Sequence, residues 1–258
     1  GEAVMSSAGV SRIPARRKMS DAEWQTRVDL AACYRLAHMN GMSKVIWNHI
    51  TARVPGEEGH ILINDLGLRY DEMTASNLLK IDFEGNVIDG NPKWLNRSGW
   101  VIHGCIHRAR PDVSCIMHTH SRGGQGVAAL KCGFLPLTQE SMMFYEEVSY
   151  HAFEGIASDL DERDRLVADL GTNDQLIMVN HGLLTTGRTI AETYWRMFYL
   201  ERACALQMDV LACGQDYVLP TREAGIKARE QYKNGKPGEK EWPALLRILD
   251  KECPDYKT

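Results

Sequence analysis

Apolar and polar residues follow two different periods along this chain, and the two periods predict different elements. Apolar positions at helical spacing mark residues 20–39, 100–108, 121–132, 158–170 and 190–213. Shorter apolar runs between turn residues predict strands at 45–54, 60–64, 79–82, 113–118, 134–137 and 175–179, with residues 87–88 closing a hairpin. The chain is therefore expected to mix helices with strands.

Polar residues mark the start of two of these helices. Ser20-Asp21-Ala22-Glu23 and Thr189-Ile190-Ala191-Glu192 both have the capping-box pattern. In that pattern the first side chain and the glutamate each satisfy an otherwise unpaired backbone amide. The helix after Thr189 is the longest, and its apolar positions surround much of its circumference. We therefore expect something besides the core to cover it, and subunit contact is the interpretation we favour.

Two histidines stand one residue apart at the end of the apolar run that begins at Val113. Alternate residues of a strand point to the same face, so His118 and His120 would project together. His181 follows the apolar run at 175–179. Three imidazoles leave one coordination position of a metal open, as in catalytic zinc sites. The alternative is that these are ordinary core or surface histidines, since the chain has nine.

Composition and charge narrow the class of protein. With 258 residues, 44% of them hydrophobic and 25% charged, the chain has an ordinary globular composition. A net charge of -4 gives no general attraction to nucleic acid or to anionic membranes, and we expect neither as a partner. No apolar run is long enough to span a membrane, and the first eighteen residues lack the apolar stretch of a secretory signal. Seven cysteines without a Cys-x-x-Cys pair fit reduced thiols and a cytoplasmic protein.

Changes in composition suggest how the chain is divided. We expect residues 1–19 to form a flexible arm, 20–214 the main domain, and 215–258 a helical tail that packs on the domain or on a neighbouring subunit. The tail is distinguished by a charged stretch after Pro220, with Gly235, Pro237 and Gly238 as breakers.

Several motifs together resemble the class II aldolase/adducin family. Arg110-Pro111-Asp112 is followed by His118-Thr119-His120 and, about sixty residues on, by Asn180-His181-Gly182-Leu183. The resemblance covers residues 20–214. It is strongest to the adducin-like branch and more distant to fuculose-phosphate aldolase and ribulose-phosphate 4-epimerase.

This resemblance implies both a fold and a cofactor. The fold would be α/β, with three layers in α/β/α order and a central, largely antiparallel sheet. His118, His120 and His181 would hold one divalent metal ion, with Zn²⁺ expected and Mn²⁺ or Fe²⁺ as alternatives. The family also implies a homotetramer with its sites at subunit interfaces.

The chain departs from the family's aldolases where they bind phosphate and transfer protons. Gly99 stands at the position of the acid/base glutamate, and of a phosphate-binding serine pair only Ser98 remains. Asn48 and Gly67 are what remains of the phosphate cradle. We expect Asn48, Arg97 and Ser98 to bind substrate, with the planar guanidinium group of Arg97 donating hydrogen bonds to a carboxylate. The alternatives are a local backbone contact for Asn48 and a plain surface charge for Arg97.

Two further groups are candidates for the site. Glu140 lies about where the aldolases place a catalytic tyrosine that reaches a neighbouring subunit's metal site. A carboxylate there can act as ligand or general base, so Glu140 is our candidate catalytic residue. Its alternative is a solvated glutamate at the start of a helix. His103 and His107 lie on one helical face, either as a ligand pair or packed against the sheet.

These features predict a divalent-metal-dependent lyase that acts on a small carbonyl or carboxylate substrate. A metal open at one position lowers the barrier to forming an enolate, which supports retro-aldol cleavage or decarboxylation. The missing glutamate and the degraded cradle disfavour a standard sugar-phosphate aldolase. Because adducin head domains share Gly99, a non-catalytic adducin-like interaction module is the alternative.

Overall fold

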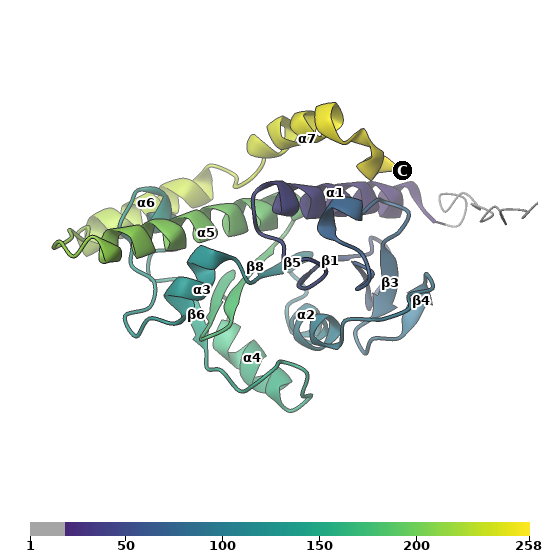
Figure 1. Cartoon of the computed structure of the whole chain (residues 1–258), viewed down its shortest axis with the longest axis horizontal. Helices are drawn as coiled ribbons and strands as arrows, with labels where there is room; N and C mark the ends of the chain where they lie inside the picture. The colour runs from purple at the N-terminus through teal and green to yellow at the C-terminus, as the bar shows by residue number, and fades with distance from the viewer. Residues whose placement is uncertain (1–18) are drawn as a thin grey trace, which may run out of the picture.

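A single eight-stranded sheet forms the centre of the molecule (Figure 1). The computed structural model describes residues 19–258, so nearly all of the predicted arm at 1–19 lies outside the described residues. The strand order is β4-β3-β2-β1-β5-β8-β7-β6, and all neighbours are antiparallel except the parallel pair β6 and β7. The strands are β1 His49–Arg53, β2 His60–Ile63, β3 Leu79–Asp82, β4 Val87–Asp89, β5 Cys115–Thr119, β6 Val148–His151, β7 Gln175–Met178 and β8 Gly182–Gly187.

Helices cover both faces of this sheet, which confirms the predicted three-layer α/β fold. α2 (Arg97–Ala109) and α4 (Glu162–Leu170) lie on one face, while α1 (Asp21–Met39) and α5 (Ile190–Ala212) cover the other (Figure 1). α3 (Arg122–Ala128) packs against α5, and α6 (Arg222–Asn234) and α7 (Glu241–Glu252) form the tail. Short 3-10 helices are η2 Tyr70–Glu72, η3 Glu140–Phe144 and η4 Pro254–Lys257. Among the described residues no helix is both long and apolar enough to cross a membrane.

Strand register decides which side chains face which layer. His49 of β1 pairs with His118 of β5. Ile50, one residue later, belongs to the core under α1 and α5, whereas Ile116 belongs to the core under α2 and α4. Since neighbours alternate along a strand, His49 and His118 both lie on the α2 face of the sheet.

The two predicted helix caps are present, but each box is only half formed. The Ser20 hydroxyl accepts the backbone N–H of Glu23 at 3.0 Å, and Thr189 accepts that of Glu192 at 3.0 Å. Glu23 does not reach back to the cap. It is 2% exposed and forms ion pairs with Arg27 at 2.9 Å and Lys80 at 2.5 Å. A buried carboxylate needs cationic partners more than the helix start needs a second cap.

Some predicted element boundaries were wrong, for identifiable reasons. Strand β1 starts only at His49, because Val45 and Asn48 adopt left-handed φ values of 54° and 73° in the preceding turn. The strand predicted at 134–137 does not form, since Leu135 donates its backbone N–H to the side chain of Gln207 instead of to a strand. α3 ends at Ala128 and α4 begins at Glu162, so both are shorter than expected.

The C-terminal tail packs on its own chain. Leu249 and Tyr256 belong to the core under α1 and α5. Arg35 of α1 forms an ion pair with Asp255 at 3.0 Å. The backbone N–H groups of residues 75 and 76 donate to the carbonyls of residues 256 and 258. The tail therefore completes the α1 side of the domain.

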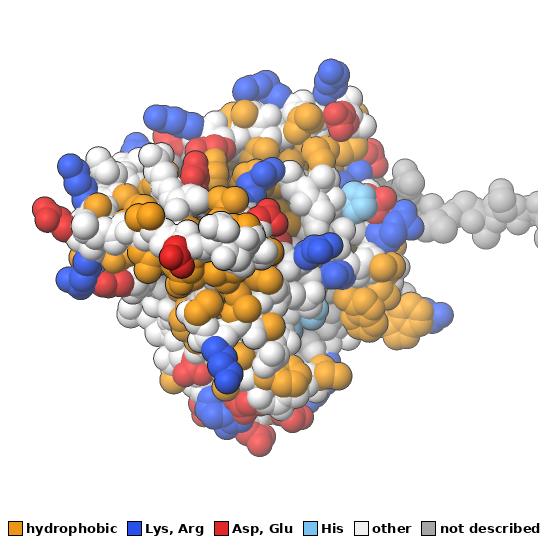
Figure 2. All heavy atoms as spheres, turned by 60° about the vertical axis from the view of Figure 1, so that its left-hand side comes forward, with side chains coloured by type: hydrophobic (Ala, Val, Ile, Leu, Met, Phe, Trp, Pro, Cys, Tyr) orange, Lys and Arg blue, Asp and Glu red, His pale blue; other side chains and the backbone are white. Residues whose placement is uncertain are grey.

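The long helix α5 is not fully covered by these contacts. An apolar groove of about 440 Å³ remains between α5 and α7, lined by Tyr194, Trp195, Phe198, Tyr199 and Trp242 among others. Figure 2 brings forward the side that carries α6 and the end of α5, and apolar side chains gather there among charged ones. Leu206 of α5 and Val218 are 41% and 88% exposed.

Candidate metal centre

The three predicted ligand histidines converge at one end of the central strands. His118 lies in β5, His120 follows that strand directly, and His181 lies in the turn between β7 and β8. Their ligand nitrogens all lie within 4.8 Å of one another. The ring centroids are 4.7 to 4.8 Å apart. This spacing allows all three imidazoles to bind a single metal ion.

Hydrogen bonds to groups outside the cluster fix the orientation of these histidines. The Nδ1 atom of His118 lies 2.8 Å from the carbonyl of Leu183, and donation there leaves the Nε2 lone pair for a metal. The backbone N–H of His120 donates to the Asn48 side chain at 3.1 Å. Asn48 therefore helps to place a ligand as well as lining the site.

The strand ends carrying the ligands are packed closely. A Cβ atom at Gly182 would lie 2.2 Å from the carbonyl oxygen of Thr119, so only glycine fits beside His181. Asn180 adopts a left-handed φ of 58° in the same turn. Asparagine tolerates this conformation better than most residues. The Asn-His-Gly sequence thus serves the turn that delivers His181.

Burial keeps the three histidines in the form that binds metals. It lowers the pKa of His181 to about 4, with the neighbouring His120 as the next cause. It also lowers the pKa of His118 far below its usual value, and that of His120 to a smaller extent. Neutral imidazoles at neutral pH need not release protons before they bind a cation.

A cavity of about 340 Å³ opens beside these histidines. It is lined by Lys44, Trp47, Asn48, His49, Asn96, Ser98, Ile102, His118, His120, Gln125 and His181. No lining residue is acidic, and Lys44 is the permanent cation among them. The cavity thus offers neutral hydrogen-bonding groups and one ammonium group to a ligand.

The other predicted site residues lie at different distances from this cavity. Asn48 and Ser98 line it, but Arg97 does not. Arg97 donates to the carbonyl of Ser158 at 2.9 Å and lies 5.1 Å from the Trp100 ring centroid. Glu140 is exposed at the start of η3 and borders a separate hollow with Tyr199. Within one chain, neither Arg97 nor Glu140 meets the histidine cluster.

Six residues that line the cavity were not singled out from the sequence: Lys44, Trp47, His49, Asn96, Ile102 and Gln125. Only His49 had a signal, because it begins the strand that follows Asn48. Its pairing with His118 depends on a register between segments far apart in the chain. His103 and His107 both contact Thr51 instead of the three histidines.

A second group containing histidine is explained by ion pairing. His151 contacts Asp169 at 2.6 Å through Nδ1 and Glu162 at 2.7 Å through Nε2. Burial lowers the pKa of His151, but the hydrogen bonds to these two carboxylates outweigh burial and raise it. Glu154 is 3.4 Å away and is itself paired with Arg165. An imidazolium between carboxylates accounts for this cluster.

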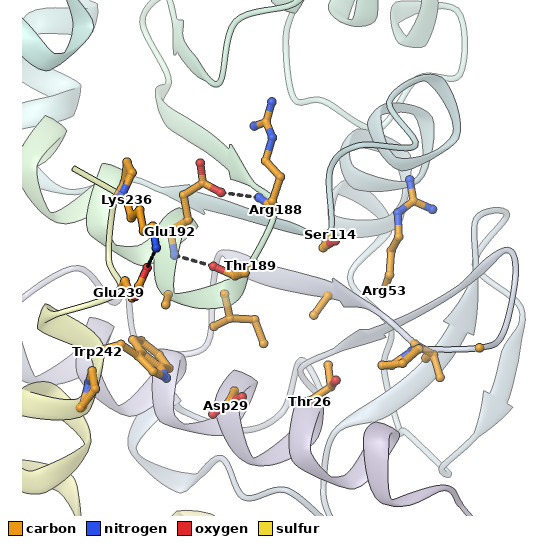
Figure 3. A pocket seen from close by; sticks show the side chains of 18 residues that line it. Thr26, Asp29, Arg53, Ser114, Arg188, Thr189, Glu192, Lys236, Glu239 and Trp242 are labelled. Carbon is orange, nitrogen blue, oxygen red and sulfur yellow. Dashed lines mark hydrogen bonds and ion pairs between the residues drawn. The ribbon is translucent and has the colours of Figure 1, made fainter. Parts of the chain in front are cut away.

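A larger cavity of about 950 Å³ lies between α1, the start of α5 and the loop before α7 (Figure 3). Asp29 comes from α1, Glu192 from α5, and Lys236 pairs with Glu239 at 3.8 Å. Its charged side chains have mixed signs, and Arg188 and Glu192 form ion pairs with Asp174 and Arg196, which do not line it. The smaller cavity beside the three histidines is the candidate site because of its chemistry, despite its size.

Comparison with known proteins identifies the family. The model of the Class II Aldolase and Adducin N-terminal domain matches residues 28–208. The chain belongs to the class II aldolase/adducin family. A Caulobacter vibrioides protein whose name places it with the class 2 aldolases is 46% identical, over 98% of this chain and 99% of its own length. Rat alpha-adducin is 39% identical over 87% of this chain, which spans 33% of the adducin.

Solved structures of this family agree with the fold. An aldolase II superfamily protein from Pseudomonas syringae has a TM-score of 0.90 and 44% identity, covering 94% of this chain and 99% of the other. L-fuculose 1-phosphate aldolase from Glaciozyma antarctica has a TM-score of 0.80 and 25% identity, covering 92% and 93%. The class II aldolase fold predicted from the motifs is confirmed.

Proposed function

We propose that this chain is a divalent-metal-dependent lyase acting on a small carbonyl or carboxylate substrate. The observation that carries the proposal is the convergence of three neutral imidazoles, those of His118, His120 and His181, beside an open cavity. An ion held by these residues would supply an electrophile that polarises a substrate carbonyl. Retro-aldol cleavage and decarboxylation are the reactions that such a group supports. Zn²⁺ is the expected metal, with Mn²⁺ or Fe²⁺ as alternatives.

The cavity favours a small anionic substrate. Lys44 is the cation that lines it, and Asn48, Asn96, Ser98 and Gln125 provide neutral donors and acceptors. Arg97 was expected to bind a carboxylate, but it is held by the carbonyl of Ser158 outside the cavity. Lys44 therefore replaces Arg97 as the proposed anion partner. Gly99 offers no acid/base side chain, which separates this site from that of a sugar-phosphate aldolase.

A homotetramer would bring Glu140 to this chemistry from a neighbouring subunit. Glu140 is exposed and distant from the cavity of its own chain, so it could serve only across an interface. The open apolar groove on α5 supports such an assembly. Glu140→Gln is expected to abolish turnover and leave the metal content unchanged. Unchanged turnover would remove Glu140 from the mechanism.

A cytoplasmic location fits the state of the cysteines. All seven are free, and four of them are buried. Reduced thiols of this kind are usual in the cytoplasm and rare in secreted proteins.

The second candidate function is a non-catalytic, adducin-like interaction module. The 39% identity to rat alpha-adducin favours it, because that similarity covers most of this chain. An intact trio of neutral histidines argues for the enzyme, since folding alone does not require such convergence.

Elemental analysis of protein purified without added metal or chelator tests the choice. We expect about one divalent ion per chain, lost in His118→Ala and kept in the control His60→Ala, at a histidine on β2 away from the cavity. Failure to bind zinc, manganese or iron(II) even after reconstitution would overturn the lyase and favour the interaction module.

A further inference from the structure

Two asparagines that line the candidate cavity have side-chain orientations fixed by backbone groups. The N–H of Gly99 donates to Asn96 Oδ1 at 3.2 Å, and the N–H of His120 donates to Asn48 Oδ1 at 3.1 Å. A backbone N–H can only donate, so the side-chain atom that faces it must be the amide oxygen. The amino group of each asparagine therefore lies on the other side of its amide, away from these backbone groups.

The amino groups of both asparagines are free to bind a ligand. Neither Nδ2 atom has a hydrogen-bond partner among the described residues, and neither is sealed from solvent, whereas Asn64 Nδ2 is. Asn96 and Asn48 are 8% and 4% exposed, and both line the cavity beside the three histidines. We therefore place their unpartnered amino groups at the cavity wall. A buried donor without a partner costs free energy, which an acceptor oxygen of a ligand would offset.

Asn96 also stands directly before α2, at the positive end of that helix. Its side chain caps the helix by accepting the N–H of Gly99, and the first turn of α2 contains no acidic residue. The first N–H groups of a helix have no partner within it, and the helix dipole favours a negative charge near them. Ser98, in the first turn, lines the same cavity. The start of α2 thus favours an anion beside Asn96.

Three of the four ammonium and amide side chains that line the cavity offer donors to a ligand. Lys44 can only donate, and Asn48 and Asn96 have their oxygens occupied. Gln125 has the opposite polarity, because its amino group donates to the carbonyl of His181 at 3.2 Å and leaves its oxygen free. No carboxylate lines the cavity. A small ligand with a carboxylate and a hydroxyl group matches this set.

We propose that Asn96 is a specificity-determining residue whose Nδ2 amino group donates to the carboxylate of a small hydroxy-carboxylate substrate. This inference rests on the proposed function, because it assumes that the substrate binds beside the histidine trio. Asn48 and Lys44 line the same cavity and would complete the contacts to the anion. A ligand without an acceptor at this point would leave the amino group of Asn96 unpaired and would bind more weakly. The sequence did not indicate this role, because the contact with Gly99 decides which end of the amide is free.

Two substitutions separate this role from helix capping, because serine and aspartate cap a helix about as well as asparagine does. Asn96→Ser and Asn96→Asp should therefore unfold at about the same urea concentration as the unsubstituted protein. Both variants lack the amino group, and Asn96→Asp also places a negative charge opposite the carboxylate of the ligand. Asn91→Asp is the matched control, because Asn91 is exposed and does not line the cavity.

Binding of glycolate to the cobalt(II)-reconstituted protein measures the contact without an assay of turnover. Glycolate is titrated while the visible absorption of the cobalt ion is followed. We expect Asn96→Ser to keep one cobalt per chain and to weaken glycolate binding by about tenfold, since a hydrogen bond to a charged group is lost. Asn96→Asp should weaken it further, because like charges repel. Asn91→Asp should bind glycolate normally.

The possible results distinguish the role of Asn96 from the proposed function. Normal glycolate affinity in both Asn96 variants would reduce Asn96 to a helix cap and overturn its role alone. Loss of cobalt from Asn96→Ser, or an equal loss of affinity in Asn91→Asp, would also overturn it, because the effect would not come from a contact with the ligand. An unsubstituted protein that binds no cobalt would overturn the proposed function itself, and one that binds cobalt but not glycolate would overturn the carboxylate site.

A second measurement observes the amino group itself and needs no variant to fold. In ¹H–¹⁵N spectra of the zinc-loaded protein, the side-chain amino signals of Asn96 should shift when glycolate is added. Those of Asn91 should stay in place. Amino signals of Asn96 that do not move at saturating glycolate would contradict the proposal.

Discussion

The carboxylate of Glu201 on α5 accepts the backbone N–H of Gly124 in α3 at 2.7 Å. The same carboxylate accepts the N–H of Gly123 at 2.7 Å and the hydroxyl of Ser121 at 2.7 Å. It accepts hydrogen bonds from amides at the start of α3 that have no partner within the helix, and its negative charge is favourable at a helix N-terminus. Because α3 begins two residues after His120, this cap also anchors the segment that carries the second of the three predicted ligands.

Replacing Glu201 by glutamine should destabilise the fold. The amide keeps the shape but turns its NH2 group, a donor, towards groups that are themselves donors, so we expect a loss of about 2–3 kcal/mol in the free energy of unfolding. Urea denaturation measures it. Asp209→Asn is the matched control, because Asp209 is exposed on the same helix. Equal stability of the two variants would contradict the capping role.

Replacing Glu23 should destabilise the fold more than the loss of a helix cap would, because Glu23 forms buried ion pairs. Glu23→Ala leaves Arg27, 1% exposed, and Lys80 without a shared carboxylate, so we expect a loss of about 3–5 kcal/mol. Ser20→Ala removes only the cap and should cost about 1 kcal/mol. Thermal or urea unfolding compares the two variants. Similar losses would mean that Glu23 acts only at the helix end.

His107 should make the metal-free protein less stable in acid. Its folded-state pKa of about 3 lies below the ordinary value of 6.5, so the unfolded chain takes up a proton first as the pH falls. Its contribution to stability is therefore complete above pH 6.5 and declines between there and about pH 3, at up to about 1.4 kcal/mol per pH unit.

His107→Gln should reduce that slope, because the glutamine amide keeps a hydrogen-bonding group beside Thr51 but does not titrate. Urea midpoints measured between about pH 4 and pH 8 test this expectation. Parallel curves for the two proteins would show that His107 is not the group responsible.

How far the sequence predicts the site depends on whether a feature is local. The alternation of His118 and His120 at the end of an apolar run was enough to place their two side chains together. The Ser20 and Thr189 caps also depend on neighbours within four residues. These features were predicted correctly because strand and helix periodicity determine them directly.

Features set by distant contacts were not predictable in this way. Arg97 is held by Ser158, sixty-one residues away, so its direction cannot be read from its surroundings in the chain. β8 was missed because Gly182–Gly187 lacks polar alternation, being buried on both faces between β5 and β7. The place of the His49 ring at the cavity depends on the register of β1 against β5 and on the space left by Gly99.

The close packing at Gly182 bears on how the protein would acquire its metal. Because there is little space between the turn at His181 and the carbonyl of Thr119, we expect the three imidazoles to keep their spacing when an ion binds. Ordering the chain would then cost little free energy when the metal binds, and the metal-free and metal-bound structures would nearly superimpose. The affinity of nitrogen donors for first-row divalent ions follows the same general order at most sites, so the occupant would reflect cellular supply as much as ligand design.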